Sequence, residues 1–232
     1  MVLRSLKRAV FKSPATRVAL EQLARTFSNG RGRGVEPGSS SGLGSFKAWL
    51  GSVQTGTVLE LGTRRVAGDP PTVRRTWVAP SVRYVACDYM SGLDVDAVVD
   101  AERLSKTFEA GSIDAVIACS VFEHIRRPWL AAEQIGKVLR PGGRVYVQTH
   151  QCYPIHAHPY DYWRFSREAM ETLFAQEFGF KNQASWYEYP ASILSERNPL
   201  AVAHEAFLNV NLVAEKDGEN AAGHEPQPTR SA

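Results

Sequence analysis

The chain has 232 residues, of which 44% are hydrophobic and 22% are charged, and its formal net charge is +3. This length suits one substantial domain, and the composition is ordinary for a globular protein. The net charge is too small to indicate nucleic-acid binding, so we expect no nucleic-acid partner. No segment approaches the roughly 20 consecutive apolar residues that a membrane-spanning helix requires, so we expect no stable membrane insertion.

The three cysteines, Cys87, Cys119 and Cys152, are widely spaced and odd in number. Two of them fall in segments that we expect to be buried strands. This pattern suggests neither a disulfide framework nor a zinc knuckle. A reducing compartment fits best, and we expect the protein to be cytoplasmic.

The composition changes along the first 44 residues. Residues 14–27 have the apolar periodicity of a helix, whereas residues 29–44 are rich in glycine, serine and arginine. Such a segment buries too little apolar surface to order itself, so we expect a flexible connector or lid. The predicted domains are therefore an N-terminal helix with linker at 1–44, a folded domain at 45–215 and a disordered tail at 216–232.

From residue 45, short helical and extended patterns alternate. We expect helices at 46–53 and 72–78, and strands at 57–61, 82–88, 96–99 and 113–119. A helix starting at Pro128 follows, because proline suits a first helical turn, and its apolar positions are Trp129, Ala132, Ile135 and Leu139. Pro141 and two glycines should end this helix before a strand at 144–149. Alternating strands and helices predict an α/β fold with a mostly parallel sheet.

The last regular part begins with a helix at 166–178 that Ser166 should cap. Alternating segments at 180–187 and 207–215 predict two more strands. If these strands pair with each other, they add an antiparallel hairpin to the edge of the sheet. The same edge could support a homodimer.

Several residues lie where an open parallel sheet binds ligands, outside the carboxyl ends of its strands. Gly62 follows the first strand, and Asp88 ends the second. A glycine there lets the backbone approach a ligand, and a carboxylate there can accept both hydroxyls of a ribose. Asp100 is placed to accept a hydrogen bond from an adenine amino group. Together they imply an adenosine-type ligand, although each alone is more common as a turn residue or helix cap.

The order of these motifs resembles the class I S-adenosylmethionine-dependent methyltransferases, specifically the bacterial small-molecule type. The similarity covers about residues 57–149 and is most specific at 113–147, where Ser-Val-Phe-Glu-His-Ile precedes a helix and Leu-Arg-Pro-Gly-Gly follows it. The resemblance implies a Rossmann-like methyltransferase fold, with a mostly parallel central sheet, a C-terminal antiparallel hairpin and helices on both faces. It also implies S-adenosylmethionine as cofactor and a small-molecule acceptor as partner.

The resemblance further implies a set of cofactor-binding residues, which run from the methionine end through the ribose and adenine to the pocket floor and the methyl group: Glu60, Gly62, Asp88, Asp100, Ala101, Cys119, Ser120 and Glu123. His124 would stand beside Glu123 near the transferable methyl. Glu123 has two alternative roles, because a carboxylate before a helix often caps it or pairs with a nearby arginine, here Arg126.

The first loop departs from the family pattern. Arg64 stands where a second glycine is usual, and Arg65 follows it. These arginines would either meet the carboxylate of the cofactor or fold over an altered pocket, which makes a catalytically silent binding module the alternative function. A nicotinamide-dependent oxidoreductase is a third possibility. The single glycine argues against it, because a pyrophosphate needs a closer backbone approach.

Residues 150–165 concentrate histidines and aromatic side chains after the fifth strand, and a similar loop occurs in a subset of the family. Loops at this end of a sheet commonly supply substrate contacts. We expect acceptor contacts from Tyr160, Asp161, Trp163 and Arg164. The aromatic side chains could equally belong to the core.

The catalytic candidates are the histidines His124, His156 and His158. A hydroxyl acceptor needs a base, and an imidazole titrates near neutral pH. A metal site from His156, His158 and Asp161 has possible but undiagnostic spacing, so no metal is predicted. The histidines could also simply order the loop. The sequence thus predicts an enzyme that transfers a methyl group from S-adenosylmethionine to an oxygen or nitrogen of a small-molecule or sugar-like acceptor.

Overall fold

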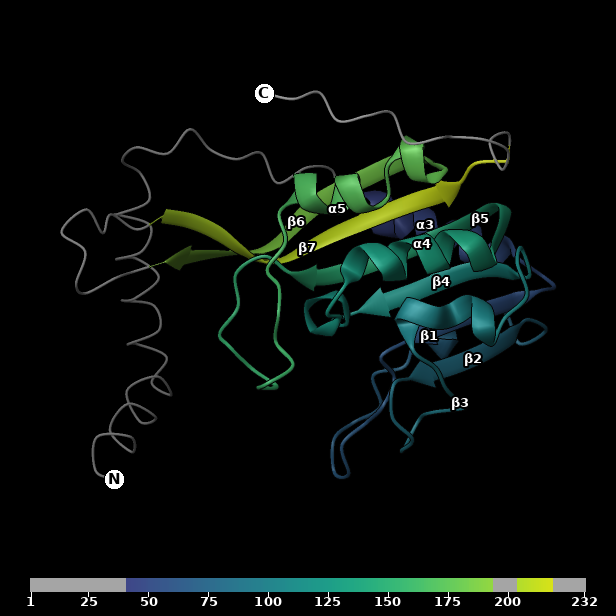
Figure 1. Ribbon diagram of the computed structural model, residues 1–232, viewed down its shortest axis with the longest axis horizontal. Coiled ribbons are helices and arrows are strands. Elements are labelled where there is room, and N and C mark those ends of the chain that lie inside the picture. The colour runs from purple at the N-terminus through teal and green to yellow at the C-terminus, as the bar shows by residue number, and fades with distance from the viewer. Residues whose placement is uncertain (1–40, 194–203, 219–232) are drawn as a thin grey trace.

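The computed structural model describes residues 41–193 and 204–218 (Figure 1). The helix expected at 14–27, most of the expected linker and most of the expected tail lie outside the described residues. Within the described part, seven strands form one sheet in the order β3-β2-β1-β4-β5-β7-β6. Their bounds are β1 Thr57–Leu61, β2 Arg83–Asp88, β3 Ala97–Val98, β4 Ile113–Cys119, β5 Leu139–His150, β6 Phe180–Ile193 and β7 His204–Lys216.

Strands β1 to β5 pair in parallel, whereas β7 pairs antiparallel with both β5 and β6. This arrangement confirms the predicted mostly parallel sheet with a C-terminal antiparallel hairpin at its edge. The order reverses at β1, which has β2 on one side and β4 on the other. A crevice between the carboxyl ends of such strands is where open α/β sheets bind ligands.

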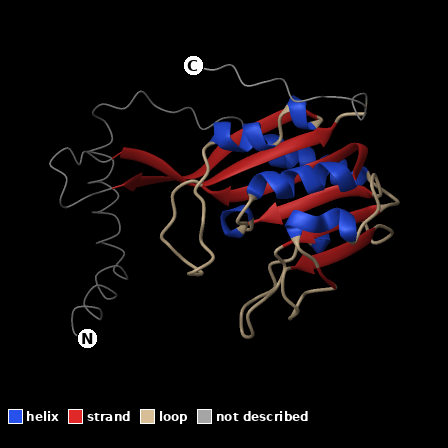
Figure 2. Ribbon diagram, in the orientation of Figure 1, coloured by secondary structure: helices blue, strands red, loops and turns tan. Residues whose placement is uncertain are grey.

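Helices cover both faces of the sheet (Figure 2). The described α-helices are α3 Ser41–Ser52, α4 Pro128–Val138 and α5 Arg167–Leu173. Short 3-10 turns complete the set: η1 Arg75–Trp77, η2 Ala101–Lys106, η3 Phe122–His124 and η4 Gln176–Phe178. Helices α4 and α5 and turn η2 cover one face, and α3 covers the other.

The centre of the sheet is buried between two hydrophobic clusters. All residues of β4 are buried, and its side chains alternate between the two faces. Val116 and Ala118 belong to the cluster under α4, whereas Ala115 and Ile117 belong to the cluster under α3. A strand buried on both faces has no solvent-exposed side, which explains why Asp114, paired with Arg140, is the one charged residue in its otherwise apolar sequence.

Three boundaries differ from the sequence-based expectation. Helix α3 begins at Ser41, inside the expected linker, and Gly42 in its first turn packs closely against Trp186: a Cβ at Gly42 would lie 2.4 Å from the Trp186 ring. The helix expected at 72–78 is only the 3-10 turn η1, and α5 ends at Leu173 rather than near residue 178. The cap of α5 is confirmed, because Ser166 Oγ accepts a hydrogen bond from the Ala169 N–H at 3.1 Å.

Strand β5 is also longer than expected. It begins at Leu139, so the proline and glycines that should separate helix and strand lie inside the strand. A Cβ at Gly143 would lie 2.9 Å from the carbonyl oxygen of Asp114, so glycine permits the close approach to β4. Trp129, expected on the apolar face of the half-buried helix α4, is 51% exposed and meets Trp163 edge-on, with ring centroids 6.1 Å apart.

Candidate active site

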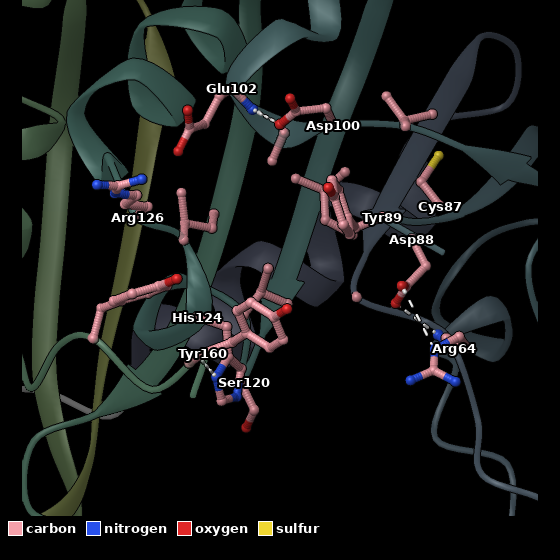
Figure 3. A pocket seen from close by; sticks show the side chains of 17 residues that line it. Arg64, Cys87, Asp88, Tyr89, Asp100, Glu102, Ser120, His124, Arg126 and Tyr160 are labelled. Atoms are coloured by element: carbon pink, nitrogen blue, oxygen red, sulfur yellow. Dashed lines mark hydrogen bonds and ion pairs between the residues drawn. The ribbon is translucent and has the colours of Figure 1, made fainter. Parts of the chain in front are cut away.

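A cavity of about 580 Å³ opens at the carboxyl ends of β1, β2 and β4 (Figure 3). Five of the eight predicted cofactor residues line it: Gly62, Asp88, Asp100, Ala101 and Ser120. They come from four separate strand ends, so the sheet topology alone brings them together. The cavity lies at the reversal of strand order, where the fold predicts a ligand site.

Gly62 lies directly after β1 and lines the cavity. Its φ of +76° lies in the left-handed region that favours glycine. A Cβ at this position would lie 2.2 Å from Val121 Cγ2, and Val121 also lines the cavity. A side chain here would therefore strain the backbone and crowd the space that a ligand could occupy.

Asp88 is held in place by backbone hydrogen bonds. Its Oδ2 accepts the N–H of Arg64 at 3.0 Å, and its Oδ1 accepts the N–H of Met90 at 3.0 Å. A carboxylate has about four lone-pair sites, so each oxygen keeps capacity for a ligand hydroxyl. Backbone groups of two loops thus fix the orientation of Asp88 and leave lone pairs of its carboxylate free for a ligand.

The two arginines of the first loop have different positions. Arg64 lines the cavity, its Nε lies 4.0 Å from Asp88 Oδ1, and its Cγ packs over Gly92. Arg65 is not among the lining residues and pairs with Asp94 at 2.6 Å. The cavity persists beside Arg64, so the arginines do not fold over and fill the pocket.

Asp100 and Ser120 shape the two neighbouring strand ends. Asp100 Oδ1 accepts the N–H of Glu102 at 2.9 Å and thereby caps η2. Ser120 has a φ of +56°, which is uncommon for a residue other than glycine, and its N–H donates to the Gln148 carbonyl at 2.9 Å. Backbone conformations of this kind concentrate at functional sites.

Two predicted cofactor residues are buried away from the lining. Glu60 Oε1 accepts from Arg74 Nη1 at 2.7 Å, and its Oε2 accepts from the Arg74 N–H at 2.7 Å and from the Tyr84 hydroxyl. Burial and this carboxylate raise the pKa of Tyr84 well above its usual range. Cys119 is also buried outside the lining residues, and burial raises the pKa of its thiol to about 12. Their contact with the cofactor stays a prediction.

Glu123 has an environment that the sequence did not predict. Its side chain is fully buried, Oε2 accepts a hydrogen bond from Thr149 Oγ1 at 2.7 Å, and His150 Nε2 lies 3.0 Å from Oε1. Burial by itself would raise the pKa of Glu123, but His150 and Thr149 outweigh it, so the pKa is lowered. Within the described residues, Glu123 neither caps α4, whose N-cap lacks a side-chain hydrogen bond, nor pairs with Arg126. Both alternatives for Glu123 are therefore wrong.

The loop at 150–165 divides into cavity wall and framework. Tyr160 and Tyr162 line the cavity, as does His124 from η3. Figure 3 shows His124 next to Tyr160, and His124 Nδ1 lies 2.7 Å from the Tyr160 carbonyl oxygen. His158 is exposed and does not line the cavity, and His156 also lies outside the lining.

The other predicted acceptor contacts hold the loop itself together. Arg164 binds Asp161 through two hydrogen bonds of 2.6 and 2.8 Å, and it holds the pKa of that carboxyl well below its usual range. Trp163 Nε1 donates to the Ile125 carbonyl at 3.0 Å. The N–H groups of Tyr162 and Trp163 both donate to the Glu123 carbonyl, at 2.8 and 3.2 Å. A direct role for Asp161, Trp163 and Arg164 in acceptor binding stays a prediction.

Sequence reasoning missed His150, Tyr89 and Tyr162. His150 ends β5 beside Glu123 because β4 and β5 are parallel neighbours whose register pairs Cys119 with Gln148. The rule that carboxyl ends of neighbouring parallel strands meet could have found it. Tyr89 and Tyr162 line the cavity from loops, where sequence periodicity carries no signal.

The comparisons with known proteins agree with this geometry. The sequence model of the methyltransferase domain family matches residues 78–147, which run through β2, β4, η3 and α4 into β5. The chain matches none of the curated proteins with which it was compared.

Solved structures share the fold. The YcgJ protein from Bacillus subtilis superposes with a TM-score of 0.53 at 13% identity, over 77% of this chain and 99% of that chain. A SAM dependent methyltransferase from Archaeoglobus fulgidus gives 0.52 at 11% identity, over 75% and 91%. At this level of identity the likeness concerns the fold alone.

The family match covers the segment that carries much of the cavity, and that segment sits on a sheet with the predicted reversal of strand order. Together the family match and the fold support a class I methyltransferase that depends on S-adenosylmethionine. Its cofactor is S-adenosylmethionine, which supplies a methyl group on a positively charged sulfur, and the cradle at Gly62 and the carboxylates of Asp88 and Asp100 fit such a nucleoside. Within 41–193 and 204–218, no helix has the length and apolarity to cross a bilayer.

Proposed function

We propose that the protein methylates an oxygen or nitrogen of a small-molecule or sugar-like acceptor. The observation that carries this proposal is the size and rim of the cavity. Its volume of about 580 Å³ falls in the range of small-molecule sites. Three tyrosines, Tyr89, Tyr160 and Tyr162, line it while remaining 75%, 64% and 42% exposed. Such rings present flat apolar faces and hydroxyl groups, which suit a sugar, a phenol or a heterocycle.

The cofactor would lie along the strand ends. In this assignment Asp88 holds the ribose, Asp100 and Ala101 border the adenine, and Ser120 lies at the pocket floor. Support comes from their common position in the cavity lining and from the free lone pairs of the Asp88 carboxylate. Arg64 lies close enough to Asp88 to contact the carboxylate of the cofactor's methionine part or its ribose edge.

The acceptor would enter between the aromatic rim and η3. His124 is the predicted catalytic histidine that lines the cavity. The Tyr160 carbonyl can only accept, so His124 Nδ1 carries the hydrogen and Nε2 is free to accept one from an acceptor hydroxyl or amine. Bound S-adenosylmethionine would supply the methyl group from its sulfonium to the acceptor atom, and His124 Nε2 would hold the hydrogen of that acceptor atom during the transfer. The chain contributes chiefly alignment of this in-line displacement.

Two measurements on the full-length protein test the proposal. Calorimetric titration with S-adenosylhomocysteine should show binding; absence of heat at high concentrations of both would support the silent binding module instead. Conversion of S-adenosylmethionine should then be followed across panels of sugars, phenols and heterocyclic amines. Turnover with peptides or nucleic acids alone would contradict the small-molecule acceptor.

His124→Ala should lower turnover about tenfold or more, because one hydrogen bond to the acceptor is lost. Affinity for S-adenosylhomocysteine should change by less than about threefold. His124→Gln, whose amide oxygen can still accept, should recover part of the loss. Full turnover in His124→Ala would remove His124 from the acceptor site. The cytoplasmic location and the homodimer stay predictions.

A further inference from the structure

Three imidazole rings converge on one buried carboxylate oxygen beside the cavity. The Oε1 atom of Glu123 lies 3.0 Å from His150 Nε2, 3.8 Å from His124 Nε2 and 4.0 Å from His156 Nε2. The rings come from η3, from the end of β5 and from the following loop, and they meet edge-on: the centroid of His156 lies 4.7 Å from that of His124 and 5.1 Å from that of His150.

The opposite nitrogen of each ring is already occupied by an oxygen. His124 Nδ1 lies 2.7 Å from the Tyr160 carbonyl, and His156 Nδ1 lies 3.3 Å from the Pro154 carbonyl. Both carbonyls can only accept, so both Nδ1 atoms carry hydrogen. His150 Nδ1 lies 3.1 Å from Asn209 Oδ1, which is likewise an acceptor. The Nε2 atoms of His150 and His156 then turn lone pairs toward Glu123, as in histidines whose outer nitrogen is fixed by a protein oxygen while the inner one binds a metal.

The carboxylate oxygen at the centre has no well-formed partner. Glu123 is 0% exposed, and within the described residues Oε1 is the buried side-chain atom without a hydrogen bond of regular geometry. A buried charged oxygen that faces nitrogen lone pairs is costly unless a cation lies between them. Both the burial and the missing partner therefore indicate a positively charged occupant.

We propose that Glu123, His150 and His156 bind a divalent transition metal ion of the zinc type. One ligand atom from each residue lies within 4.8 Å of the others. Ligand atoms 2.0 to 2.2 Å from a tetrahedral zinc are about 3.4 Å apart, and the observed separations of 3.0 and 4.0 Å bracket that value. Two imidazoles and one carboxylate form a zinc ligand set that leaves a fourth position for water or substrate.

The surroundings complete the site. The His156 side chain is 30% exposed, which gives an ion a path from solvent. Asp161 Oδ2 accepts the backbone N–H of His156 at 2.8 Å and lies 3.4 Å from Nδ1 of its ring. His124 lies between this site and the cavity that it lines. The ion would tie the histidine-bearing loop to the ends of β4 and β5, next to the acceptor.

This site differs from the metal set that the sequence suggested. His158 is exposed and lies outside the proposed ligand set, whereas His150 and Glu123 belong to it. The sequence could not bring Glu123 and His150 together, because their contact depends on the register of β4 and β5. The prediction of no metal is thus replaced by this proposal, which does not depend on the identity of the acceptor.

The test measures metal alone, without cofactor or acceptor. The full-length protein is stripped with a chelator, incubated with Zn²⁺, freed of excess metal and analysed by mass spectrometry for zinc. We expect about one zinc ion per chain in the wild type. Glu123→Gln and His156→Ala should each weaken zinc affinity about 100-fold or more in competition titrations. His158→Ala, which alters the exposed histidine of the same loop, should bind zinc as the wild type does.

A second readout guards against misfolded variants. Co²⁺ in the wild type should give the intense visible absorption of a tetrahedral site, and His156→Ala, changed in the exposed loop, should keep its circular dichroism while losing that band. A wild type without stoichiometric zinc would overturn the proposal and leave an ion pair between a protonated His150 and Glu123. Wild-type zinc affinity in Glu123→Gln would overturn it as well, because the metal would then be bound elsewhere.

Discussion

The two walls of the cavity are built differently. The wall beyond β1 and β2 consists of two exposed loops, joined to each other by the backbone bridge between Arg65 and Leu93 and by the pair between Arg65 and Asp94 (Figure 2). In the wall beyond β4 and β5, backbone N–H groups of the loop donate hydrogen bonds to the carbonyls of Glu123 and His150. Buried side chains pack beneath this wall. We call the wall beyond β1 and β2 the cofactor wall and the wall beyond β4 and β5 the histidine wall. Regions with few buried contacts open at low free-energy cost, so the loops of the cofactor wall can change conformation, whereas the histidine wall is preorganised.

The largest effect should come from the support of the histidine wall. Phe122 is fully buried directly before Glu123, and its ring meets Phe174 with centroids 5.8 Å apart. Phe122→Ala should lower the free energy of unfolding by about 4 kcal/mol, because it removes a buried ring and leaves a cavity. Urea unfolding measures this loss. Tyr89→Ala, in the exposed cofactor wall, should change stability by less than about 0.5 kcal/mol, and equal losses in both variants would break the comparison.

Cofactor affinity should depend strongly on the one carboxylate that the cofactor wall orients. Asp88→Ala should weaken binding of S-adenosylhomocysteine about 100-fold, because two charge-assisted hydrogen bonds to the ribose are lost. Calorimetric titration gives the ratio. Asp94→Asn is the matched control: Asp94 has a φ of +62°, which asparagine tolerates, and it does not line the cavity. Unchanged affinity in Asp88→Ala would remove the ribose assignment.

The arginines of the two walls give a direct comparison. Arg164 bonds both oxygens of Asp161, whose side chain is 3% exposed, as well as the carbonyls of Tyr153 and Pro154. Arg164→Ala should therefore cost about 2 kcal/mol of stability, because Asp161 would be left without its cation. Arg65→Ala removes a pair whose members are each more than 20% exposed and should cost clearly less than Arg164→Ala, because solvent screens that pair. Urea midpoints at constant slope measure both, and a larger loss for Arg65→Ala would reverse the ranking.

Residues whose position follows from local pattern and topology were predictable. The bounds of β1 and β4 follow from short apolar runs. The strand-end rule predicts that Gly62, Asp88 and Asp100 lie close together, and all three line the same cavity. These inferences need only the period of a buried strand and the common direction of parallel strands.

Features that depend on distant partners were not predictable. Gly42 lies in a helix that packs on Trp186, a residue far away in the sequence. Glu123 is buried against Thr149 and His150, which lie at the end of the neighbouring strand β5. Trp129 fits the helical period yet lies at the surface, since its partner Trp163 belongs to a loop. A single sequence carries the residues of such contacts but no signal that pairs them.

The two walls should also differ in the rates at which their cysteines react. Burial raises the pKa of Cys87 and of Cys119 to about 12, which leaves roughly a thousandfold less thiolate than an ordinary cysteine near neutral pH. Cys152 is only half-buried and should react first with a thiol reagent in the native protein. Cys87 lines the cavity under the looser wall, so local opening should expose it before Cys119. Mass spectrometry of peptides over time measures this order, and saturating S-adenosylhomocysteine should slow Cys87 without changing Cys152. If Cys119 reacted as fast as Cys87, the two walls would open together and the histidine wall would not be the more rigid one.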